Sequence, residues 1–197
     1  MRTVAALYCL PDERCIYRTM PGVEVWDEAR DARNYDDGMP VVAHPPCGPW
    51  GRMRQFCKGG DGLRELAPLA VAQVRTHGGV LEHPAHSTLW DTGMCMAKPG
   101  QGPDVWGGYT IEVDQFHWGH PCRKKTWLYI MGVSKGQLPP MPFRQGKPEL
   151  LVAPSTKDRR AGLGRGRYLP KSQRSVTPRA FAEWLVEIAR RSHGVGR

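Results

Sequence analysis

Residues 41–47 have the sequence VVAHPPC, and this stretch determines the fold that the sequence predicts. Three apolar residues, followed after His44 by two prolines, are typical of a short, fully buried strand that ends abruptly. A second apolar run at residues 79–84, GVLEHP, ends in the same manner. Each run delivers a reactive side chain at its carboxyl end, which is the edge of an open α/β sheet where ligands bind.

The remaining chain alternates between strand-like and helix-like patterns. Further strands are expected at residues 3–10, 22–26, 109–113 and 126–131. Helical patterns cover residues 27–35, 67–77, 87–90 and 177–192, and residues 91–108 have the composition of a long loop. Pro68 and Pro178 suit the first position of their helices, with Thr177 as an N-cap. This alternation predicts an α/β domain whose mostly parallel sheet is flanked by helices.

The length of 197 residues suits one domain with a proper core. We expect an α/β catalytic-type core over residues 1–133 and a basic region rich in proline and glycine over residues 134–176. A helix over residues 177–192 follows and packs on the core. Its apolar side chains fall on one helical face: Phe181, Trp184, Leu185 and Ile188.

A net charge of +9 favours a polyanionic partner, most often nucleic acid. Seven basic residues and one acid lie between residues 157 and 174, and we expect this segment to bind nucleic acid. No apolar run approaches the roughly 20 residues that span a bilayer, so no membrane partner and a cytoplasmic location are expected. The expected nucleic-acid-binding residues are Arg159, Arg160, Arg165, Arg167, Lys171 and Arg174.

Cys47 is the candidate nucleophile. None of the six cysteines forms a CxxC pair, so neither a disulfide framework nor a paired zinc site is indicated. Cys47 lies on a loop with two glycines, which let backbone approach a substrate, and with Arg52 and Arg54, which can favour a thiolate. The alternative is a buried structural cysteine after a strand.

Two further segments complete the candidate site. Glu82 ends the second apolar run, where partial burial can keep a carboxyl group protonated and able to donate a proton. Arg123, Lys124 and Lys125 lead directly into the strand at residues 126–131 and can bind a phosphate or brace a loop. The alternatives are a capping or surface acid at Glu82 and a solvated strand entrance at residues 123–125.

The order of these three segments resembles the catalytic half of DNA cytosine-5 methyltransferases. That family has a Pro-Cys loop, a Glu-Asn-Val strand end and a Gln-x-Arg-x-Arg segment before a strand that ends in glycine. The matching stretches are Pro46-Cys47, residues 82–84 and residues 123–125 before Gly132. The resemblance covers residues 40–133 and implies a reduced, Rossmann-like methyltransferase-type core. The chain also looks like small proteins encoded by phages and prophages.

The resemblance implies covalent base modification in DNA that is single-stranded or has one base flipped out. Cys47 would add to carbon 6 of cytosine, Glu82 would protonate or hydrogen-bond ring nitrogen 3, and carbon 5 would take the transferred group. Arg123 and Lys125 would support these catalytic residues. The expected substrate-binding residues are His44, Pro46, Trp50, Arg52, Arg54, His83 and His120.

The sequence departs from the family at the cofactor turn. The family binds S-adenosylmethionine with a glycine-rich turn after its first strand, and the first glycine here is Gly22. His83 and Pro84 also replace Asn and Val. The cofactor therefore stays unidentified, and S-adenosylmethionine lacks its expected binding turn. Thymidylate synthases offer a similar Pro-Pro-Cys nucleophile followed by Gln-Phe, here residues 45–47 and 55–56, and they attack the same ring carbon.

Two other functions remain open at this stage. A non-catalytic relative of the same fold would only bind nucleic acid. A metal-dependent enzyme would use histidine and cysteine ligands at the strand ends, namely His44, Cys47, His83 and His120. Four tryptophans in expected loops, which either stack on an unpaired base or anchor the loops, are Trp50, Trp90, Trp106 and Trp118.

Overall fold

Six strands form one mixed sheet in the computed structural model, which describes residues 1–58, 61–151, 168–170 and 173–194. The strand order is β2-β1-β3-β4-β6-β5. The pairs β1–β2, β1–β3 and β3–β4 are parallel, whereas β6 runs antiparallel to both β4 and β5. The strands are β1 (Val4–Leu7), β2 (Val23–Trp26), β3 (Val41–Ala43), β4 (Gly79–Pro84), β5 (Tyr109–Asp114) and β6 (Lys125–Met131).

The strand order places the chemistry-bearing segments at one edge of the sheet. The chain leaves β1 on one side to form β2 and returns on the other side as β3, so β1 and β3 flank a topological switch point. Strand β4 follows β3 in the sheet, and its last residue Pro84 pairs with Thr126 near the start of β6. The carboxyl ends of β1, β3 and β4 therefore meet the start of β6.

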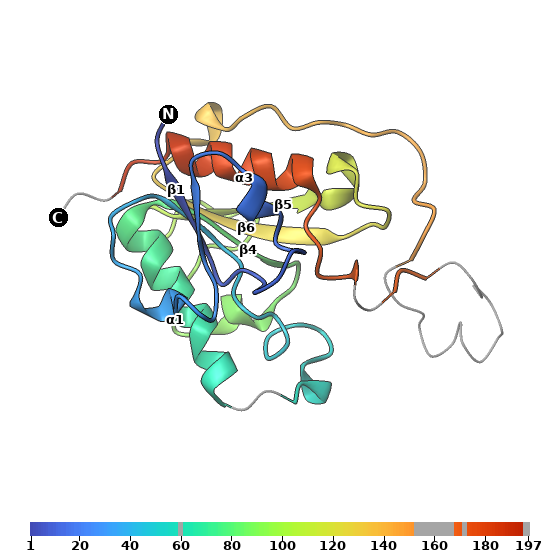
Figure 1. The fold of residues 1–197 in the computed structure, drawn as a ribbon, viewed down its shortest axis with the longest axis horizontal. Coiled ribbons are helices and arrows are strands. Elements are labelled where there is room, and N and C mark those ends of the chain that lie inside the picture. Colours follow the sequence, from blue (N-terminus) through green and yellow to red (C-terminus); the bar gives the residue numbers. More distant parts are fainter. Residues whose placement is uncertain (59–60, 152–167, 171–172, 195–197) are drawn as a thin grey trace.

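Helices α1 (Asp61–His77) and α3 (Arg179–Arg191) cover opposite faces of the sheet (Figure 1). Side chains alternate along each strand, so Val42 packs in the cluster on the α3 side, while Val41 and Ala43 pack in the cluster on the α1 side. The expected apolar face of the last helix is confirmed, since its buried residues include Phe181, Trp184, Leu185 and Ile188.

The predicted strands are confirmed, but three helical predictions change. Only a 3-10 turn forms within residues 27–35, because buried residues there are too few for a packed helix. Helix α1 begins six residues before the predicted start, so Pro68 lies inside it. Leu63 and Leu66 extend the apolar spacing of the helix into these largely exposed first turns. Helix α3 begins at Arg179 with Pro178 as its N-cap in place of Thr177.

Short 3-10 helices connect these elements. They are η1 (Ile16–Thr19), η2 (Ala32–Asn34), η3 (Arg54–Phe56), η4 (Thr88–Asp91), η5 (Gln115–Trp118) and η6 (Lys135–Gln137). The predicted turn at residues 87–90 is confirmed as η4, whose N-cap Ser87 accepts a hydrogen bond from the backbone N–H of Leu89. The predicted loop at residues 91–108 contains no helix or strand beyond the end of η4.

Gly79 allows β4 to lie directly against β3. Its φ of +118° belongs to the region that favours glycine. A Cβ atom at this position would lie 2.0 Å from the backbone oxygen of Val41. Any larger residue would therefore force the two strands apart at the point where α1 ends and β4 begins.

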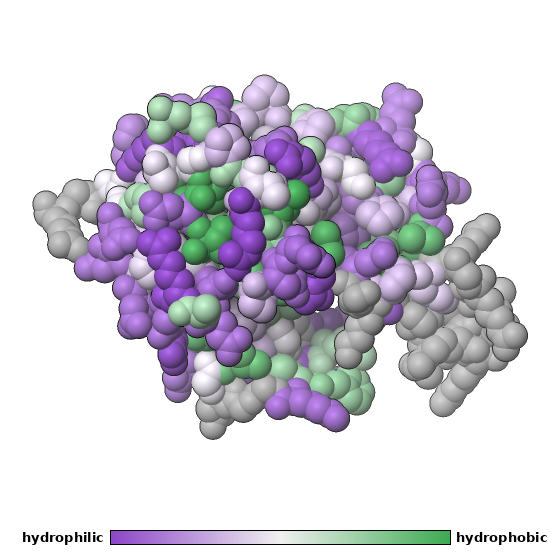
Figure 2. Space-filling model, viewed as in Figure 1, coloured by the Kyte–Doolittle hydropathy of each residue, from purple (hydrophilic) through white to green (hydrophobic). Residues whose placement is uncertain are grey.

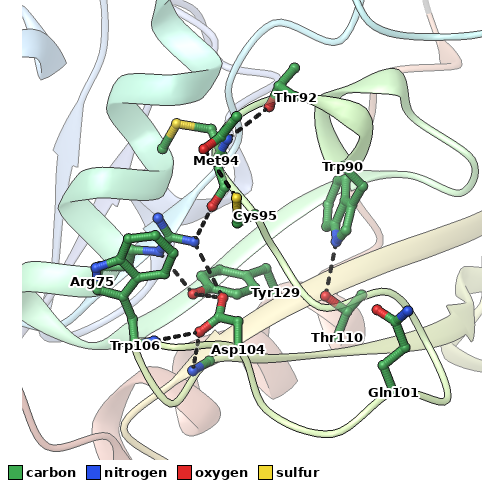
Figure 3. Close-up of polar contacts among 12 residues, drawn as sticks. Arg75, Trp90, Thr92, Met94, Cys95, Gln101, Asp104, Trp106, Thr110 and Tyr129 are labelled. Carbon is green, nitrogen blue, oxygen red and sulfur yellow. Dashed lines mark hydrogen bonds and ion pairs between the residues drawn. The ribbon is translucent and has the colours of Figure 1, made fainter.

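A polar cluster on the α1 face fixes the loop that precedes β5 (Figure 3). Arg75 forms a buried ion pair with Asp104 at 3.2 Å and donates to the carbonyl of Met94 at 2.6 Å. Tyr129 on β6 donates to the same carboxylate at 2.7 Å. The guanidinium of Arg75 also lies 3.5 Å from the ring centroid of Trp106. These contacts join α1, the loop and β6.

The molecular face in Figure 2 is largely hydrophilic, with smaller apolar patches. None of the helices in the described ranges is long and apolar enough to cross a membrane. The expected basic region at residues 134–176 is described only in part, since residues 152–167 and 171–172 lie outside the described residues.

Candidate active site

A cavity of about 730 Å³ lies at the sheet edge where β1, β3 and β4 end and β6 begins. One wall comes from the segment between β1 and η1, and the other from the ends of β3 and β4 and the start of β6. Its lining residues include Tyr8, Cys9, Arg14, Cys15, Tyr17, His44, Pro46, Cys47, Arg52, Glu82, Arg123, Lys124, Lys125 and Arg174. The structure therefore brings together the two strand ends and the basic segment that the sequence singled out.

A hydrogen-bonded chain of three side chains forms the floor of this cavity. Glu82 accepts from His44 Nδ1 at 3.2 Å, and Nε2 of the same histidine lies 2.7 Å from the hydroxyl of Tyr17. His44 and Glu82 occupy the same sheet face because each lies two residues beyond a residue of the α3-side cluster, Val42 and Val80. With His44 neutral, its Nδ1–H donates to Glu82 and the tyrosine hydroxyl donates to Nε2.

Gln115 is the second donor to Glu82. Its side-chain amide nitrogen lies 2.9 Å from Glu82 Oε1 and 3.0 Å from the hydroxyl oxygen of Thr126. Burial raises the pKa of Glu82, but the hydrogen bond from His44 and the positive charge of Lys124 outweigh this effect. The resulting pKa is about 2, so Glu82 is ionised at neutral pH.

The ionised Glu82 differs from the protonated acid that the sequence predicts. Burial alone would have favoured the neutral form. The donors on both carboxylate oxygens come from η5 and from the residue after β3, and they stabilise the charged form instead. Each oxygen retains capacity for a further hydrogen bond, and Glu82 lines the cavity, so a ligand with N–H groups can complete its shell.

Cys47 lies exposed in the loop that follows β3. Its carbonyl accepts from the backbone N–H groups of Trp50 and Gly51, at 3.1 and 2.8 Å, so the thiol stands at the start of a tight turn. Desolvation by neighbouring protein atoms and the negative charge of Glu82 raise the pKa of Cys47. The positive charge of Lys124 offsets part of this increase. The thiol form therefore predominates at neutral pH, in contrast to the thiolate that the nearby arginines were expected to favour.

The three basic residues before β6 have different roles. Arg123 pairs with Asp114 at 3.3 Å and Lys125 pairs with Glu112 at 2.8 Å. In the described part of the chain, Lys124 forms no ion pair with a carboxylate, and its charge acts on both Cys47 and Glu82. The sequence predicted Arg123 and Lys125 as the catalytic supports, whereas the geometry favours Lys124.

The cavity carries a strong positive charge. Among the lining residues that the structure describes, Glu82 is the single acid, against six lysine and arginine side chains. These basic residues are Arg14, Arg52, Arg123, Lys124, Lys125 and Arg174. An anionic ligand such as a phosphate suits this lining. Of the predicted nucleic-acid-binding residues, Arg174 lines the cavity. Outside the described residues lie Arg159, Arg160, Arg165, Arg167 and Lys171.

Four predicted substrate-binding residues do not line the cavity. His83 is fully buried on the α1 side of β4, where its Nδ1 lies 2.8 Å from the hydroxyl of Ser87. His120 is buried against the backbone of Cys122, and Trp50 packs in the α1-side cluster with 3 % of its surface exposed. Arg54 is exposed on η3 away from the lining.

The other loop tryptophans serve mainly as anchors. Trp90 and Trp118 are buried, which contradicts an exposed stacking role for them. Trp106 is 45 % exposed but stacks against Arg75. An exposed ring is found instead at Phe143, outside the cavity lining, which is 77 % exposed and stacks on His117 with a centroid distance of 5.2 Å.

The residues of the metal hypothesis do not form a ligand set. Within residues 1–58, 61–151, 168–170 and 173–194, no three histidine, cysteine, aspartate or glutamate side chains gather as metal ligands. The sheet explains the separation of His44 and His83, because adjacent positions at the strand ends face opposite sides. His44 is also engaged by Tyr17 and Glu82.

The turn after β1 differs from a glycine-lined cofactor site. Tyr8 takes the left-handed backbone conformation there, with φ of 59°, and its hydroxyl donates to Gln73 on α1 at 2.7 Å. Tyr8, Cys9 and Leu10 all line the cavity. Side chains thus occupy the position where glycines would let a ligand approach the backbone.

Sequence reasoning missed Tyr17, Gln115, Cys9 and Cys15. Tyr17 and Cys15 lie in a loop whose 3-10 turn has no periodic pattern, and Gln115 reaches Glu82 only through the pairing of β5 with β6. The one available signal was the short apolar run of residues 15–17 between Arg14 and Arg18.

Comparison with known proteins adds no relative to this description: no family model, curated protein or solved structure matches the chain.

Proposed function

We propose that this protein modifies a pyrimidine base in DNA, with cytosine as the base and Cys47 as the nucleophile that attacks ring carbon 6. The observation that carries the proposal is the joint presence of Cys47 and Glu82 in one basic cavity at the ends of adjacent parallel strands. A thiol suited to covalent attack and a carboxylate suited to the ring nitrogen edge are the two groups that such chemistry needs. The proposal includes a reduced, methyltransferase-type core.

Glu82 acts on the ring in its ionised form. A carboxylate with free lone pairs accepts hydrogen bonds from the 4-amino group and from a protonated ring nitrogen 3, with the proton supplied by solvent. Protonation at nitrogen 3 makes carbon 6 electrophilic. The donors His44 and Gln115 hold the carboxylate in place, so that it stabilises the protonated ring without reorganisation.

Cys47 supplies the new bond. Its thiol loses a proton to solvent, the sulfur bonds to carbon 6, and the electron pair of the 5–6 double bond moves into the ring. Carbon 5 then carries nucleophilic character and takes the transferred group. Loss of the protons from carbon 5 and from ring nitrogen 3 to solvent, together with departure of the Cys47 sulfur as a thiolate, restores the ring. Lys124 lowers the pKa of Cys47 in part and so supports the first step.

The nucleic-acid partner is supported by the charge of the cavity and by a neighbouring aromatic surface. Arg123 lines the cavity and also lies 4.5 Å from the ring centroid of Phe116, which Arg144 approaches at 4.6 Å. The exposed Phe143 stacks on His117 beside them. Guanidinium groups that contact phosphates and a ring on which a base can stack suit single-stranded DNA or a flipped nucleotide. The cytoplasm is the proposed place of action.

Hydrogen exchange at carbon 5 tests this function without knowledge of the group donor. Attack at carbon 6 makes the hydrogen on carbon 5 exchangeable, so a cytosine oligonucleotide incubated with the protein in D₂O gains deuterium at that position. The expected result is exchange with wild type and with Cys95→Ser, an exposed cysteine outside the cavity lining, and none with Cys47→Ser. Equal carbon 5 exchange with wild type and with Cys47→Ser would contradict the proposal.

A second candidate function is nucleic-acid binding without catalysis. The raised pKa of Cys47 favours it, because a thiol is a weaker nucleophile than a thiolate. This candidate predicts that DNA affinity falls steeply with salt, that Cys47→Ser binds as wild type does, and that no carbon 5 exchange occurs.

A further inference from the structure

A second pair of cysteines lines the same cavity. Cys9 follows β1 and Cys15 precedes η1, so the loop between β1 and η1 brings both to one wall. Cys15 packs in the α3-side apolar cluster with Cys9 against it, and each cysteine acts on the pKa of the other. The thiol of Cys9 also lies 3.4 Å from the carbonyl of Ala6. Neither cysteine takes part in the proposed attack on a base.

The surroundings of the two sulfurs differ. Cys15 is 4 % exposed and is the N-cap of η1, where its carbonyl accepts from the backbone N–H of Arg18 at 3.2 Å. The neighbouring Cys9 thiol, the nearby backbone N–H groups of Tyr17 and Arg18 and the charge of Arg18 lower the pKa of Cys15 to about 6 despite burial. The neighbouring Cys15 and burial raise the pKa of Cys9. At neutral pH the Cys15 side chain is therefore mainly a thiolate and Cys9 is a thiol.

We infer that Cys15 is a site of oxidation by a hydroperoxide and that Cys9 resolves the product to a Cys9–Cys15 disulfide. A nucleophilic sulfur with a second cysteine in contact is the arrangement of peroxide-sensitive pairs. The near-complete burial of Cys15 favours hydrogen peroxide, the smallest hydroperoxide, over larger disulfide oxidants. This inference does not depend on base modification.

The disulfide forms in two steps. The Cys15 sulfur attacks one oxygen of hydrogen peroxide, the O–O bond breaks, and the leaving hydroxide takes a proton to form water, which leaves Cys15 as a sulfenic acid. The Cys9 thiol then attacks the Cys15 sulfur, its proton joins the departing hydroxide, and a second water leaves. Two thiols are oxidised and one peroxide is reduced, and an external thiol reverses the change.

Oxidation of this cysteine pair can affect the candidate active site through η1. Cys15 caps the 3-10 helix that carries Tyr17, and the hydroxyl of Tyr17 contacts His44 in the Glu82 network. A covalent bond from Cys15 to the segment after β1 fixes η1 in a new position relative to His44. Where the proposed function holds, the disulfide therefore alters the support of Glu82.

Peptide mapping after brief peroxide treatment of the reduced full-length protein tests the inference. Trypsin cuts after Arg2, Arg14 and Arg18, so the expected product links residues 3–14 to residues 15–18 and has lost two hydrogen atoms. The rate rises with pH and reaches half its maximum near pH 6. A link between residues 34–52, which contain Cys47, and residues 55–58, which contain Cys57, as the main product overturns the inference.

Single variants separate the two roles. Cys9→Ser leaves a sulfenic acid at Cys15 that dimedone labels, whereas Cys15→Ser leaves Cys9 unlabelled. Cys95→Ser, which removes an exposed cysteine, forms the Cys9–Cys15 link at the wild-type rate. Labelling of Cys9 in Cys15→Ser at the rate seen for Cys15 in Cys9→Ser contradicts the assignment. Loss of carbon 5 exchange with normal disulfide formation counts only against the proposed function.

Discussion

Two buried acids on opposite faces of one sheet pair with a basic partner at the same distance. Glu82 lies 3.2 Å from His44 on the α3 side, and Asp104 lies 3.2 Å from Arg75 on the α1 side. The carboxylate side chains are 12 % and 4 % exposed. By length and burial, the two pairs are nearly equivalent.

The number of donors separates them. Asp104 accepts from Arg75, from the hydroxyl of Tyr129 and from the backbone N–H groups of Trp106 and Gly108 (Figure 3). Glu82 has two side-chain donors and lines a cavity. The carboxylate of Asp104 has four hydrogen-bond donors, so its acceptor sites are filled and its role is structural. The carboxylate of Glu82 can accept further hydrogen bonds and lies beside a cavity, so it can bind a ligand.

Removal of Arg75 should have the largest effect on stability. Arg75→Ala leaves Asp104 buried without its cation, and loss of one partner of a buried pair costs about 3–5 kcal/mol. Urea unfolding measures this loss. The matched control is Lys98→Ala, which breaks a pair whose side chains are 47 % and 58 % exposed and should cost less than about 1 kcal/mol. Equal losses for the two variants would refute the structural role of the Arg75 pair.

Glu82→Gln should lower the free energy of unfolding by an amount that depends on pH. The pKa of Glu82 is about 2 in the folded protein and has an ordinary value of 4.5, so the charged form stabilises the fold above pH 4.5. This contribution, roughly 3 kcal/mol, disappears as the pH falls from 4.5 to 2. Wild type should therefore be more stable than Glu82→Gln at pH 7 and equal to it near pH 2 in urea unfolding.

His83 titrates in the same experiment and is coupled to Glu82. Burial lowers the pKa of His83 to about 4 from its ordinary 6.5, so the unfolded chain takes up the proton first as the pH falls. The resulting loss of stability begins below pH 6.5 in both proteins and should be larger in Glu82→Gln, because the charge of Glu82 raises the pKa of His83 in wild type. A stability difference between the two proteins that stays constant from pH 7 to pH 2 would argue against an ionised Glu82.

The same substitution in both regions compares them directly. Tyr129→Phe removes a buried hydroxyl that donates to Asp104 and accepts from Arg75, and should cost about 2–3 kcal/mol. Tyr17→Phe removes a contact to His44 beside a cavity that water can enter, and should cost about 1 kcal/mol. Thermal or urea unfolding ranks the two, and the reverse order would contradict the distinction between a closed and an open pair.

Lys124→Gln should have the smallest effect, a modest decrease in the alkylation rate of Cys47. Loss of its charge raises the pKa of Cys47, so alkylation of this thiol by iodoacetamide at pH 8 should slow roughly two- to threefold. Lys125→Gln is the matched control, because Lys125 is paired with Glu112. Alkylation that slows more in Lys125→Gln than in Lys124→Gln would transfer the supporting role to Lys125.

The strands and their reactive ends could be predicted because buried runs such as residues 41–43 and 79–81 have a simple signature. The protonation states of Cys47 and Glu82 could not be predicted from the sequence. They depend on Lys124, Gln115 and His44, which come close to them only in the folded sheet. The misplaced His83 reflects the same limit. Its neighbour Glu82 faces the cavity, and a strand sends adjacent side chains to opposite faces.

The most direct test of the central claim is the site of covalent attachment to an activated base. A single-stranded oligonucleotide that contains 5-azacytosine is more readily attacked at carbon 6 and needs no group donor. The account predicts an adduct on the tryptic peptide of residues 34–52, at Cys47, that persists in Cys15→Ser and is lost in Cys47→Ser and strongly slowed in Glu82→Gln. An adduct on residues 15–18, or its persistence in Cys47→Ser, would contradict the assignment of Cys47 as the nucleophile.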